Sequence, residues 1–495
     1  MEDATPASDR LGRFVAASAA LLGLVAATYY AWAGLTLSHF DAKGHLVVAR
    51  RIIDSLTPGW VQVGALWLPL PHLVNVFPTQ IDFFYTTGAF AVAVSVASFA
   101  LAAWAIARLI AQATGSRAAA LIGVIVFAAN PNVLYLQATP MTEPMLWGLV
   151  CAGIALLVPA LATGESRALH RAGLVLAGAV LTRYEAWLAC AAALACGGAG
   201  LLWQSTAWKT VCRRLVLVTV YPATAIVGFL LLSRATVGEW FVKSGFFVPD
   251  AATLGDPVAS VAAISRGLTQ LTSEPLTWLG WAGLAAGVGL AIGRRNRALG
   301  VLPVAVMAMG VLPGVAFFEG HVYRVRYMVT LIPAVAIGAG LLVGHCRGRW
   351  RWLAAALVLL AIYDGPKPFN AEAPMPTEAQ WDRSLRIGRM QVTAYLERNW
   401  DRTPVMASMG SLAHYMHELS GSGFHIRDFL HEGNGDIWLS ALVYPDPLVE
   451  WILIEESARG GDMLAALVRQ RPAFLSGYQR VAEGGGVALY RRRAR

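Results

Sequence analysis

Charged residues are scarce in this sequence of 495 residues. Asp, Glu, Lys and Arg together make up 14% of the chain, whereas hydrophobic residues make up 57%. An ordinary soluble domain has roughly 25% charged residues, so a single soluble globule is excluded. A disordered chain is excluded as well, because the 17 Trp, 14 Tyr and 18 Phe residues accompany long apolar runs that must be buried. The composition therefore predicts a protein that crosses a membrane several times.

Cysteine is also rare, with five residues in the chain. Cys151, Cys190 and Cys196 lie within apolar runs, and Cys212 and Cys346 lie in short basic loops. None falls in a segment expected on the oxidising side of the membrane, so we expect the exterior parts to be held without disulfides. The first apolar run is too long for a secretory signal peptide and lacks a small-residue cleavage site.

Eleven apolar stretches are candidates for membrane-spanning helices, since a span needs about 20 apolar residues. They cover residues 14–36, 82–108, 118–133, 143–163, 168–183, 186–204, 215–233, 276–293, 299–318, 328–345 and 352–364. Some stretches are short or merge with a neighbour, so a count that differs by one or two is compatible with the pattern. The fold class predicted is mainly α, a polytopic helical membrane domain of about eleven spans.

The basic residues of the loops are distributed unevenly. If the N-terminus is cytoplasmic, the inner loops contain fifteen cations, namely Arg10, Arg13, Arg108, Arg117, Arg167, Arg171, Lys209, Arg213, Arg214, Arg294, Arg295, Arg297, Arg347, Arg349 and Arg351. The longer outer loops contain nine, namely Lys43, Arg50, Arg51, Arg183, Arg234, Lys243, Arg266, Arg324 and Arg326. Cytoplasmic loops carry an excess of Lys and Arg, so this imbalance predicts that orientation, and an odd span count then places the C-terminus outside. Loop topology also accounts for the basic surplus, so no nucleic-acid partner is expected.

The composition changes after residue 364. Residues 365–376 are rich in proline and predict a linker. The following segment has soluble character, with helices expected near 377–400 and 462–469 and strands at 405–407, 451–454 and 487–490. We therefore predict two domains, a transmembrane domain of residues 1–364 and a small exterior α/β domain of residues 365–495.

Ionisable residues gather at the outer ends of the predicted spans. They include Asp41, His45, His72, Glu143, Arg183, Glu185, His321, Arg324 and Arg326. A transporter is expected to place some such groups near the middle of the bilayer, where they mark a transport pathway. Their clustering on one face indicates instead an active site at the exterior interface.

Asp41 stands at the start of a stretch in which Leu46, Ala49 and Ile53 recur at helical spacing. This spacing predicts an amphipathic helix in the membrane interface, with its cations on the polar side. Asp41 is equally suited to cap that helix or to act in a site. His45 follows one turn later on the same face, which suits a shared proton or ion site, although a single interfacial His is more often structural.

Two further segments of the outer face carry candidate residues. His72 ends the run Trp67-Leu68-Pro69-Leu70-Pro71-His72, in which two prolines predict either a rigid support for His72 or a re-entrant bend. Glu143 lies between Thr142 and Pro144. It either begins a helix, where the macrodipole favours an acid, or binds a ligand.

These features together resemble the GT-C glycosyltransferase superfamily, which includes the protein O-mannosyltransferases and the enzyme that adds aminoarabinose to lipid A. The likeness rests on an acid just after the first span, a helix with an Ala-Arg pair, a proline-rich end to the first outer loop and a soluble exterior domain. It extends to Thr142-Glu143, to the run Leu181-Thr182-Arg183-Tyr184-Glu185-Ala186-Trp187 and to the pair Arg326-Tyr327.

The resemblance implies a membrane glycosyltransferase that moves a hexosyl or pentosyl group from a polyprenyl-phosphate donor. The acceptor would be a glycan, a lipid or a protein at the exterior face, and the transfer would invert the anomeric centre. Asp41 is similar to the family's first-loop catalytic acid and would act as general base. Arg183 and Arg326 would bind the donor phosphate, because guanidinium groups bind phosphate oxygens bidentately.

The remaining candidates are acceptor or metal ligands, namely His45, His72, Glu143, Glu185 and His321. No cofactor is implied with certainty, and a divalent metal ion is left open because Asp41-Ala42 stands where many relatives have an Asp-Glu pair. For Arg183, a buried ion pair with its neighbours agrees with the sequence as well as a ligand contact does. Arg324 is expected to extend to lipid headgroups. A multispan transporter or lipid flippase is the alternative function.

Overall fold

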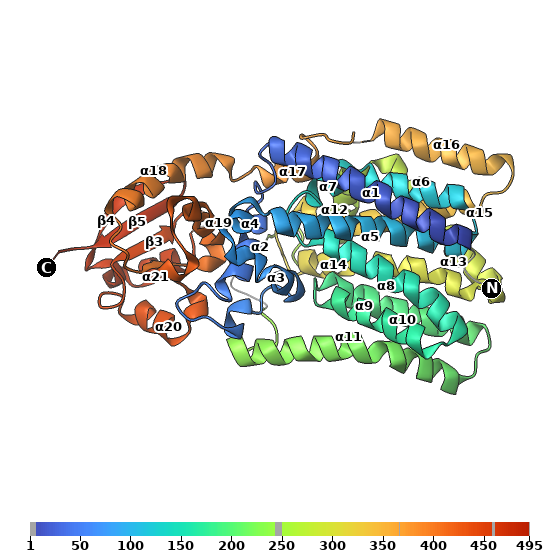
Figure 1. Ribbon diagram of the computed structural model, residues 1–495, viewed down its shortest axis with the longest axis horizontal. Coiled ribbons are helices and arrows are strands. Elements are labelled where there is room, and N and C mark those ends of the chain that lie inside the picture. Colours follow the sequence, from blue (N-terminus) through green and yellow to red (C-terminus); the bar gives the residue numbers. More distant parts are fainter. Residues whose placement is uncertain (1–5, 243–249, 366, 458–460, 495) are drawn as a thin grey trace. The chain divides into compact units, whose positions relative to one another are not determined.

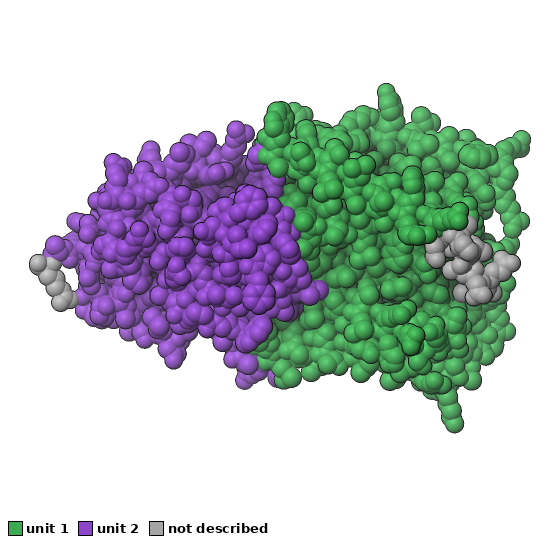
Figure 2. All heavy atoms as spheres, in the orientation of Figure 1, with its two compact units in different colours: residues 1–33, 92–232, 247–377 green, residues 34–91, 233–246, 378–495 purple. Residues whose placement is uncertain are grey.

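The structure is a computed structural model, and it describes residues 6–242, 250–365, 367–457 and 461–494 (Figure 1). The chain divides into two compact units, each built from three segments (Figure 2). Unit 1 comprises residues 1–33, 92–232 and 247–377, and unit 2 comprises residues 34–91, 233–246 and 378–495.

Unit 1 is helical. Its elements are α1 (Pro6–Trp32), α5 (Ala89–Thr114), α6 (Arg117–Ala128), α7 (Pro131–Leu136), α8 (Glu143–Thr163), α9 (Ser166–Val180), α10 (Glu185–Trp203), α11 (Trp208–Val237), α12 (Pro257–Thr272), α13 (Glu274–Gly293), η3 (Arg295–Gly310), α14 (Val311–Phe318), η4 (Val325–Leu331), α15 (Ile332–His345), α16 (Arg349–Asp364) and α17 (Pro374–Ala379). Small residues allow some of these helices to approach closely. Gly283 on α13 faces Gly338 on α15 so closely that a Cβ at residue 283 would collide with the Gly338 carbonyl.

Eight helices among the described residues are long and apolar enough to cross a membrane. Each of the eleven predicted apolar stretches overlaps a helix. Three of the stretches fall on helices too short to be counted among these eight, namely α6, α9 and α16, with 12, 15 and 16 residues. The helical membrane class is therefore confirmed, and the count of eleven spans stays a prediction.

Unit 2 contains a five-stranded sheet with the strand order β2-β1-β3-β5-β4. Its strands are β1 (Val405–Ala407), β2 (Phe429–Leu430), β3 (Trp451–Glu455), β4 (Tyr478–Gly484) and β5 (Val487–Arg492). Strand β1 pairs in parallel with β2 and β3, whereas β5 pairs antiparallel with β3 and β4. The predicted α/β character of the C-terminal segment and its three expected strands are confirmed.

The remaining elements of unit 2 are short helices. They are α2 (Phe40–Arg51), η1 (Trp60–Val63), α3 (Leu70–Asn75), η2 (Pro78–Gln80), α4 (Asp82–Thr87), α18 (Arg383–Asn399), α19 (Met409–Leu419), η5 (Ser420–Ser422), η6 (Ile426–Asp428), η7 (Glu432–Asn434), α20 (Asp436–Val443), α21 (Met463–Gln470) and η8 (Pro472–Leu475).

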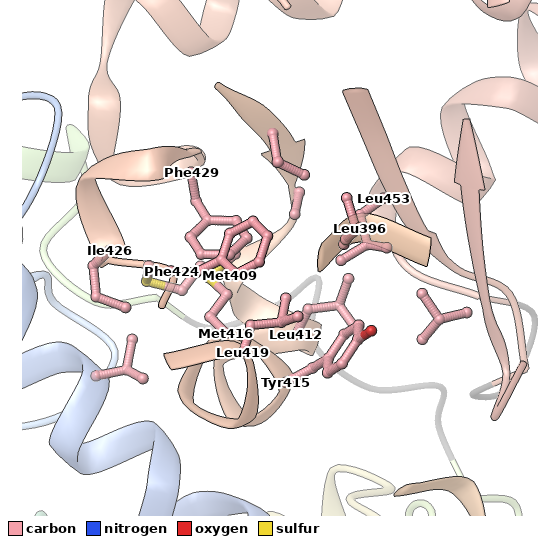
Figure 3. Close-up of a cluster of buried hydrophobic side chains, with 14 of the residues drawn as sticks. Leu396, Met409, Leu412, Tyr415, Met416, Leu419, Phe424, Ile426, Phe429 and Leu453 are labelled. Atoms are coloured by element: carbon pink, nitrogen blue, oxygen red, sulfur yellow. The ribbon is translucent and has the colours of Figure 1, made fainter. Parts of the chain in front are cut away.

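Alternate residues of a strand point to opposite sides of a sheet. In this sheet both faces are covered and buried. On one face Val405, Ala407 and Leu453 join side chains of α18 and α19, and Figure 3 shows this cluster around Leu412 and Tyr415. The opposite face packs against α20 and α21. Unit 2 therefore has a core on each side of its sheet.

Residues of the first predicted outer loop belong to this core. Leu46 and Val47 of α2 and the buried ring of Tyr85 lie in the same cluster as Leu412 and Leu453. The division of the chain therefore differs from the boundary expected at residues 364 and 365. The physical reason is that α2 buries its apolar side chains in the core of the C-terminal segment, a long-range contact that composition does not reveal.

Candidate active site

Helix α2 carries Asp41 in its first turn. The N-cap is His39, whose Nδ1 accepts a hydrogen bond of 3.1 Å from the backbone N–H of Asp41. The capping role considered for Asp41 is therefore wrong, because a neighbouring imidazole already caps the helix. Asp41 is half-buried.

The cations of α2 do not form a solvated face. The helix is buried from Ala42 to Arg50, and the side chains of Lys43 and Arg50 are 5% and 6% exposed. Lys43 pairs with Glu418 at 2.6 Å, and Arg50 pairs with Asp54 at 2.9 Å. The expected polar side with solvated cations is therefore wrong, since other parts of unit 2 pack around α2, and the location of this helix in the membrane interface stays a prediction.

The structure brings His45 and His72 together. His45 Nδ1 lies 3.1 Å from His72 Nε2, and the Trp67 ring lies 4.1 Å from the His45 ring. Both histidines are buried, and burial together with the charge of Arg51 lowers the pKa of His72 to about 3. A neutral imidazole both donates and accepts, so one ring donates to the other in this pair. The proline-rich segment thus holds His72 against α2, as a rigid support would.

A second group of candidate residues lies in unit 1. Arg183 Nη2 pairs with Glu185 Oε1 at 2.7 Å, and Arg183 Nη1 pairs with Glu143 Oε1 at 3.1 Å. Arg183 Nη1 also donates to Thr142 Oγ1 at 3.1 Å. Arg326 Nε lies 3.5 Å from Glu143 Oε1. Two guanidinium groups and two carboxylates from the starts of α8, α10 and η4 therefore form one cluster.

The hydrogen-bonding groups of this cluster are satisfied for Arg183 but only in part for Glu143. Of the five N–H groups of Arg183, four are directed at Thr142, Glu143 and Glu185, so the ion-pair alternative for Arg183 is present in the structure. Glu143 is fully buried, and its Oε2 accepts no hydrogen bond from any residue that the structure describes. A helix start alone does not explain a buried carboxylate bound by two arginines, since the macrodipole effect is small.

His321 lies in the loop between α14 and η4, five residues before Arg326. Its Nδ1 lies 3.2 Å from the Val322 carbonyl, and its ring meets Tyr327 edge-on at 5.2 Å. His321 therefore contacts the residue that follows Arg326. Within the described ranges, no group of three or more His, Cys, Asp or Glu side chains could hold a metal ion.

Sequence reasoning missed a charged network in unit 2. Glu418 on α19 binds Lys43 and also Arg389, whose Nη2 lies 3.1 Å from Glu418 Oε2. Arg389 donates to both oxygens of Asp382, at 3.0 and 2.6 Å. Lys43 and Glu418 are 375 residues apart in the sequence, so no local pattern indicates the pair. In contrast, Arg50 and Asp54 are only four residues apart, so this pair is local in the sequence, although Asp54 lies beyond the end of α2 at Arg51.

Taken together, the apolar helices and the small sheet define a polytopic helical membrane protein with a compact α/β portion. ArnT from Cupriavidus metallidurans bound to undecaprenyl phosphate is a similar solved structure. It has a TM-score of 0.59 and 14% identity, over 96% of this chain and 97% of ArnT. ArnT in the apo state gives a TM-score of 0.57 at 14% identity, over 94% and 97%.

The archaeal oligosaccharyltransferase AglB from Archaeoglobus fulgidus, in complex with an inhibitory peptide and a dolichol-phosphate, has a TM-score of 0.48 at 10% identity. That match covers 89% of this chain and 69% of AglB. No protein-family model matches the sequence, and no curated protein matches it. ArnT and AglB are members of the GT-C superfamily. The likeness to ArnT shows that this chain has the GT-C fold, so the fold that the resemblance implies is confirmed.

Proposed function

We propose that this protein transfers a sugar from a polyprenyl-phosphate donor to an acceptor at the exterior face of the membrane. The observation that carries the proposal is the likeness of 96% of the chain to ArnT bound to undecaprenyl phosphate. The position of Asp41 in the first turn of α2 supports it, because a catalytic carboxylate in the first outer loop is what the GT-C resemblance implies. The sugar is a hexose or a pentose.

In the proposed reaction, an acceptor hydroxyl or amine attacks the anomeric carbon of the donor sugar. The new bond forms from the acceptor oxygen or nitrogen, and the bond between the anomeric carbon and the phosphate oxygen breaks. Its electron pair leaves with the polyprenyl phosphate. Asp41 takes the proton that the acceptor loses, as a general base within hydrogen-bond reach does. Attack opposite the leaving phosphate inverts the anomeric centre.

Arg326 and Arg183 stabilise the departing phosphate in this proposal. A leaving phosphate carries negative charge, and fixed guanidinium donors in a region of low dielectric stabilise it more than water does. Glu143 and Glu185 hold Arg183 in one orientation, and Glu143 lies beside Arg326. His45, His72 and His321 are candidates for contacts to the acceptor or to a divalent metal ion.

The exterior location rests on the fifteen inner and nine outer cations of the predicted loops. Reporter fusions after Arg10 and after the last residue should report opposite sides of the membrane, with the N-terminus inside. If both fusions report the cytoplasm, the proposed exterior site is wrong.

The activity is tested with the full chain purified into lipid nanodiscs. Polyprenyl-phosphate-linked hexoses and pentoses are supplied one at a time with glycan, lipid and peptide acceptors, and the release of polyprenyl phosphate is measured. The proposal expects release from at least one donor that depends on both Asp41 and an acceptor. Release at equal rates from the parent and from Asp41→Asn protein would contradict it.

A further inference from the structure

Helix α2 is held by the C-terminal part of the chain on one of its sides. Leu46 and Val47 lie in the core cluster with Leu412 and Tyr415 of α19. Although Lys43 is only two residues from Asp41 in the sequence, its ammonium group is buried against Glu418 of the same helix α19. The residue proposed as general base therefore stands on a helix that packs on one side against α19.

The ion pair of Lys43 and Glu418 is short and well supported. Lys43 Nζ lies 2.6 Å from Glu418 Oε1, with side-chain exposures of 5% and 12%. Arg389 binds the other oxygen of Glu418 at 3.1 Å and is itself fixed by Asp382. Burial alone would raise the pKa of Glu418, but Lys43 and Arg389 outweigh it and lower that pKa. The carboxylate is therefore charged at neutral pH and holds the ammonium in one position.

The opposite side of α2 is held by the proline-rich segment. Successive helical residues are rotated by about 100°, so His45 lies about 40° from Asp41, whereas Lys43 lies about 200° from it. His45 contacts His72 and Trp67, and a Cβ on Gly44 would lie 3.0 Å from the Trp67 ring. Contacts on two roughly opposite sides thus determine how far α2 is rotated about its own axis, and that rotation determines where the Asp41 carboxylate points.

We infer that Lys43 and Glu418 are positioning residues for Asp41, through which the C-terminal domain sets the orientation of the catalytic helix. The inference rests on the proposed function, because it takes Asp41 as the general base. It adds a reason for the C-terminal domain to be part of the enzyme. The ion pair acts through the helix and does not contact the substrate.

The first test compares Lys43→Met and Glu418→Gln with the parent in the full chain. We expect kcat to fall by about 10- to 100-fold, the effect of a small misplacement of a catalytic group, while KM for the polyprenyl-phosphate donor changes by less than about threefold. The matched control is Glu450→Gln, because Glu450 also lies in unit 2, is 14% exposed and pairs with Arg492 at 2.8 Å. The control should keep parental kcat.

Thermal unfolding of each variant separates positioning from folding. If both Lys43→Met and Glu418→Gln fail to fold, or if both fold and keep parental kcat, the inference is overturned. A fall in kcat equal to that of Glu450→Gln overturns it as well, since the effect would then be a general loss of stability.

The second test repeats Lys43→Met in an Asp41→Asn background. If Lys43 acts through Asp41, the double variant should be no slower than Asp41→Asn alone, because there is no base left to orient. A further 10-fold loss in the double variant would overturn the inference while leaving the role of Asp41 intact. Parental turnover by Asp41→Asn alone would instead refute the proposed base, so the two failures are distinguishable.

Discussion

Two networks of buried charge, one in each unit, have their hydrogen bonds satisfied to different degrees. In unit 2, Glu418 and Asp382 bind Arg389 through both of their oxygens, and Lys43 completes the network. In unit 1, Glu143 has one oxygen that no described residue serves, and Arg326 lies 3.5 Å from the other. A fully satisfied network fixes a structure, whereas a partly satisfied one retains capacity for a ligand. The comparison agrees with the positioning role inferred for the Lys43 network and with the binding role proposed for the Glu143 cluster.

The largest effect is expected from Asp41→Asn, which changes neither network. The substitution keeps the size of the side chain, and the helix keeps its cap because His39 supplies it. The rate of transfer should fall by about 100- to 10,000-fold, the typical contribution of a general base, while the melting temperature stays near that of the parent. Turnover is measured by the release of polyprenyl phosphate. Near-parental turnover in a folded variant would remove Asp41 from the catalytic machinery.

Removing the central arginine of each network should destabilise the protein strongly. Arg183→Ala removes the nearest partner of the buried Glu143 and Glu185 and leaves Glu143 with the more distant Arg326. Arg389→Ala removes the guanidinium that binds both oxygens of Asp382 and of Glu418 and leaves Glu418 paired with Lys43. Each change should lower the free energy of unfolding by about 3–5 kcal/mol, the usual cost of breaking a buried pair on one side.

Denaturant unfolding in detergent measures these changes. The control is Arg492→Ala, because the Arg492 side chain is 38% exposed and an exposed ion pair contributes at most about 1 kcal/mol. Equal losses in all three variants would mean that burial does not distinguish these pairs.

Arg326→Ala should weaken productive use of the donor by about 1.5–3 kcal/mol in kcat/KM, the usual contribution of a hydrogen bond to a charged group. Arg326→Lys should restore only part of this, because an ammonium keeps the charge but loses the bidentate fork. Arg324→Ala, two residues away, should have little effect. Equal losses at both positions, or full rescue by lysine, would contradict a phosphate contact through Arg326.

The smallest effect concerns pH and lies in unit 2, where buried histidines stand near the Lys43 network. Burial lowers the pKa of His417 to about 4, and its Nε2 donates to the Tyr85 carbonyl at 2.9 Å. The unfolded chain binds this proton near pH 6.5 and the folded chain does not. His417 therefore contributes stability above pH 6.5 that is lost progressively between pH 6.5 and about 4.

At pH 5.5 this loss is about 1 kcal/mol for one histidine, since each pKa unit corresponds to about 1.36 kcal/mol. The melting temperature of the parent should fall between pH 7.5 and 5.5, and His417→Gln should make that fall smaller. A melting temperature that rises on acidification would show that these histidines are not held neutral.

The local sequence predicted the elements whose signals are local. Three of the five strands were expected within a few residues, because Val405–Ala407, Trp451–Glu455 and Val487–Arg492 are compact apolar runs between turn residues. Strand β4 was missed because Tyr478–Gly484 contains few apolar residues, and only Tyr478 of this strand is buried. Helix α19 was not predicted, although its buried residues Leu412, Tyr415, Met416 and Leu419 recur at helical spacing and complete the core.

Composition and hydropathy by themselves determined the membrane class and the apolar segments, since each span must satisfy its backbone inside its own helix. The short motifs also indicated four candidate site residues, namely Glu143, Arg183, Glu185 and Arg326. Only the tertiary structure decided that these four form one cluster, that His45 contacts His72, and that Lys43 finds Glu418 across 375 residues. The physical reason is that hydropathy is a property of each segment, whereas the partner of a buried charge is chosen by the packing of distant segments.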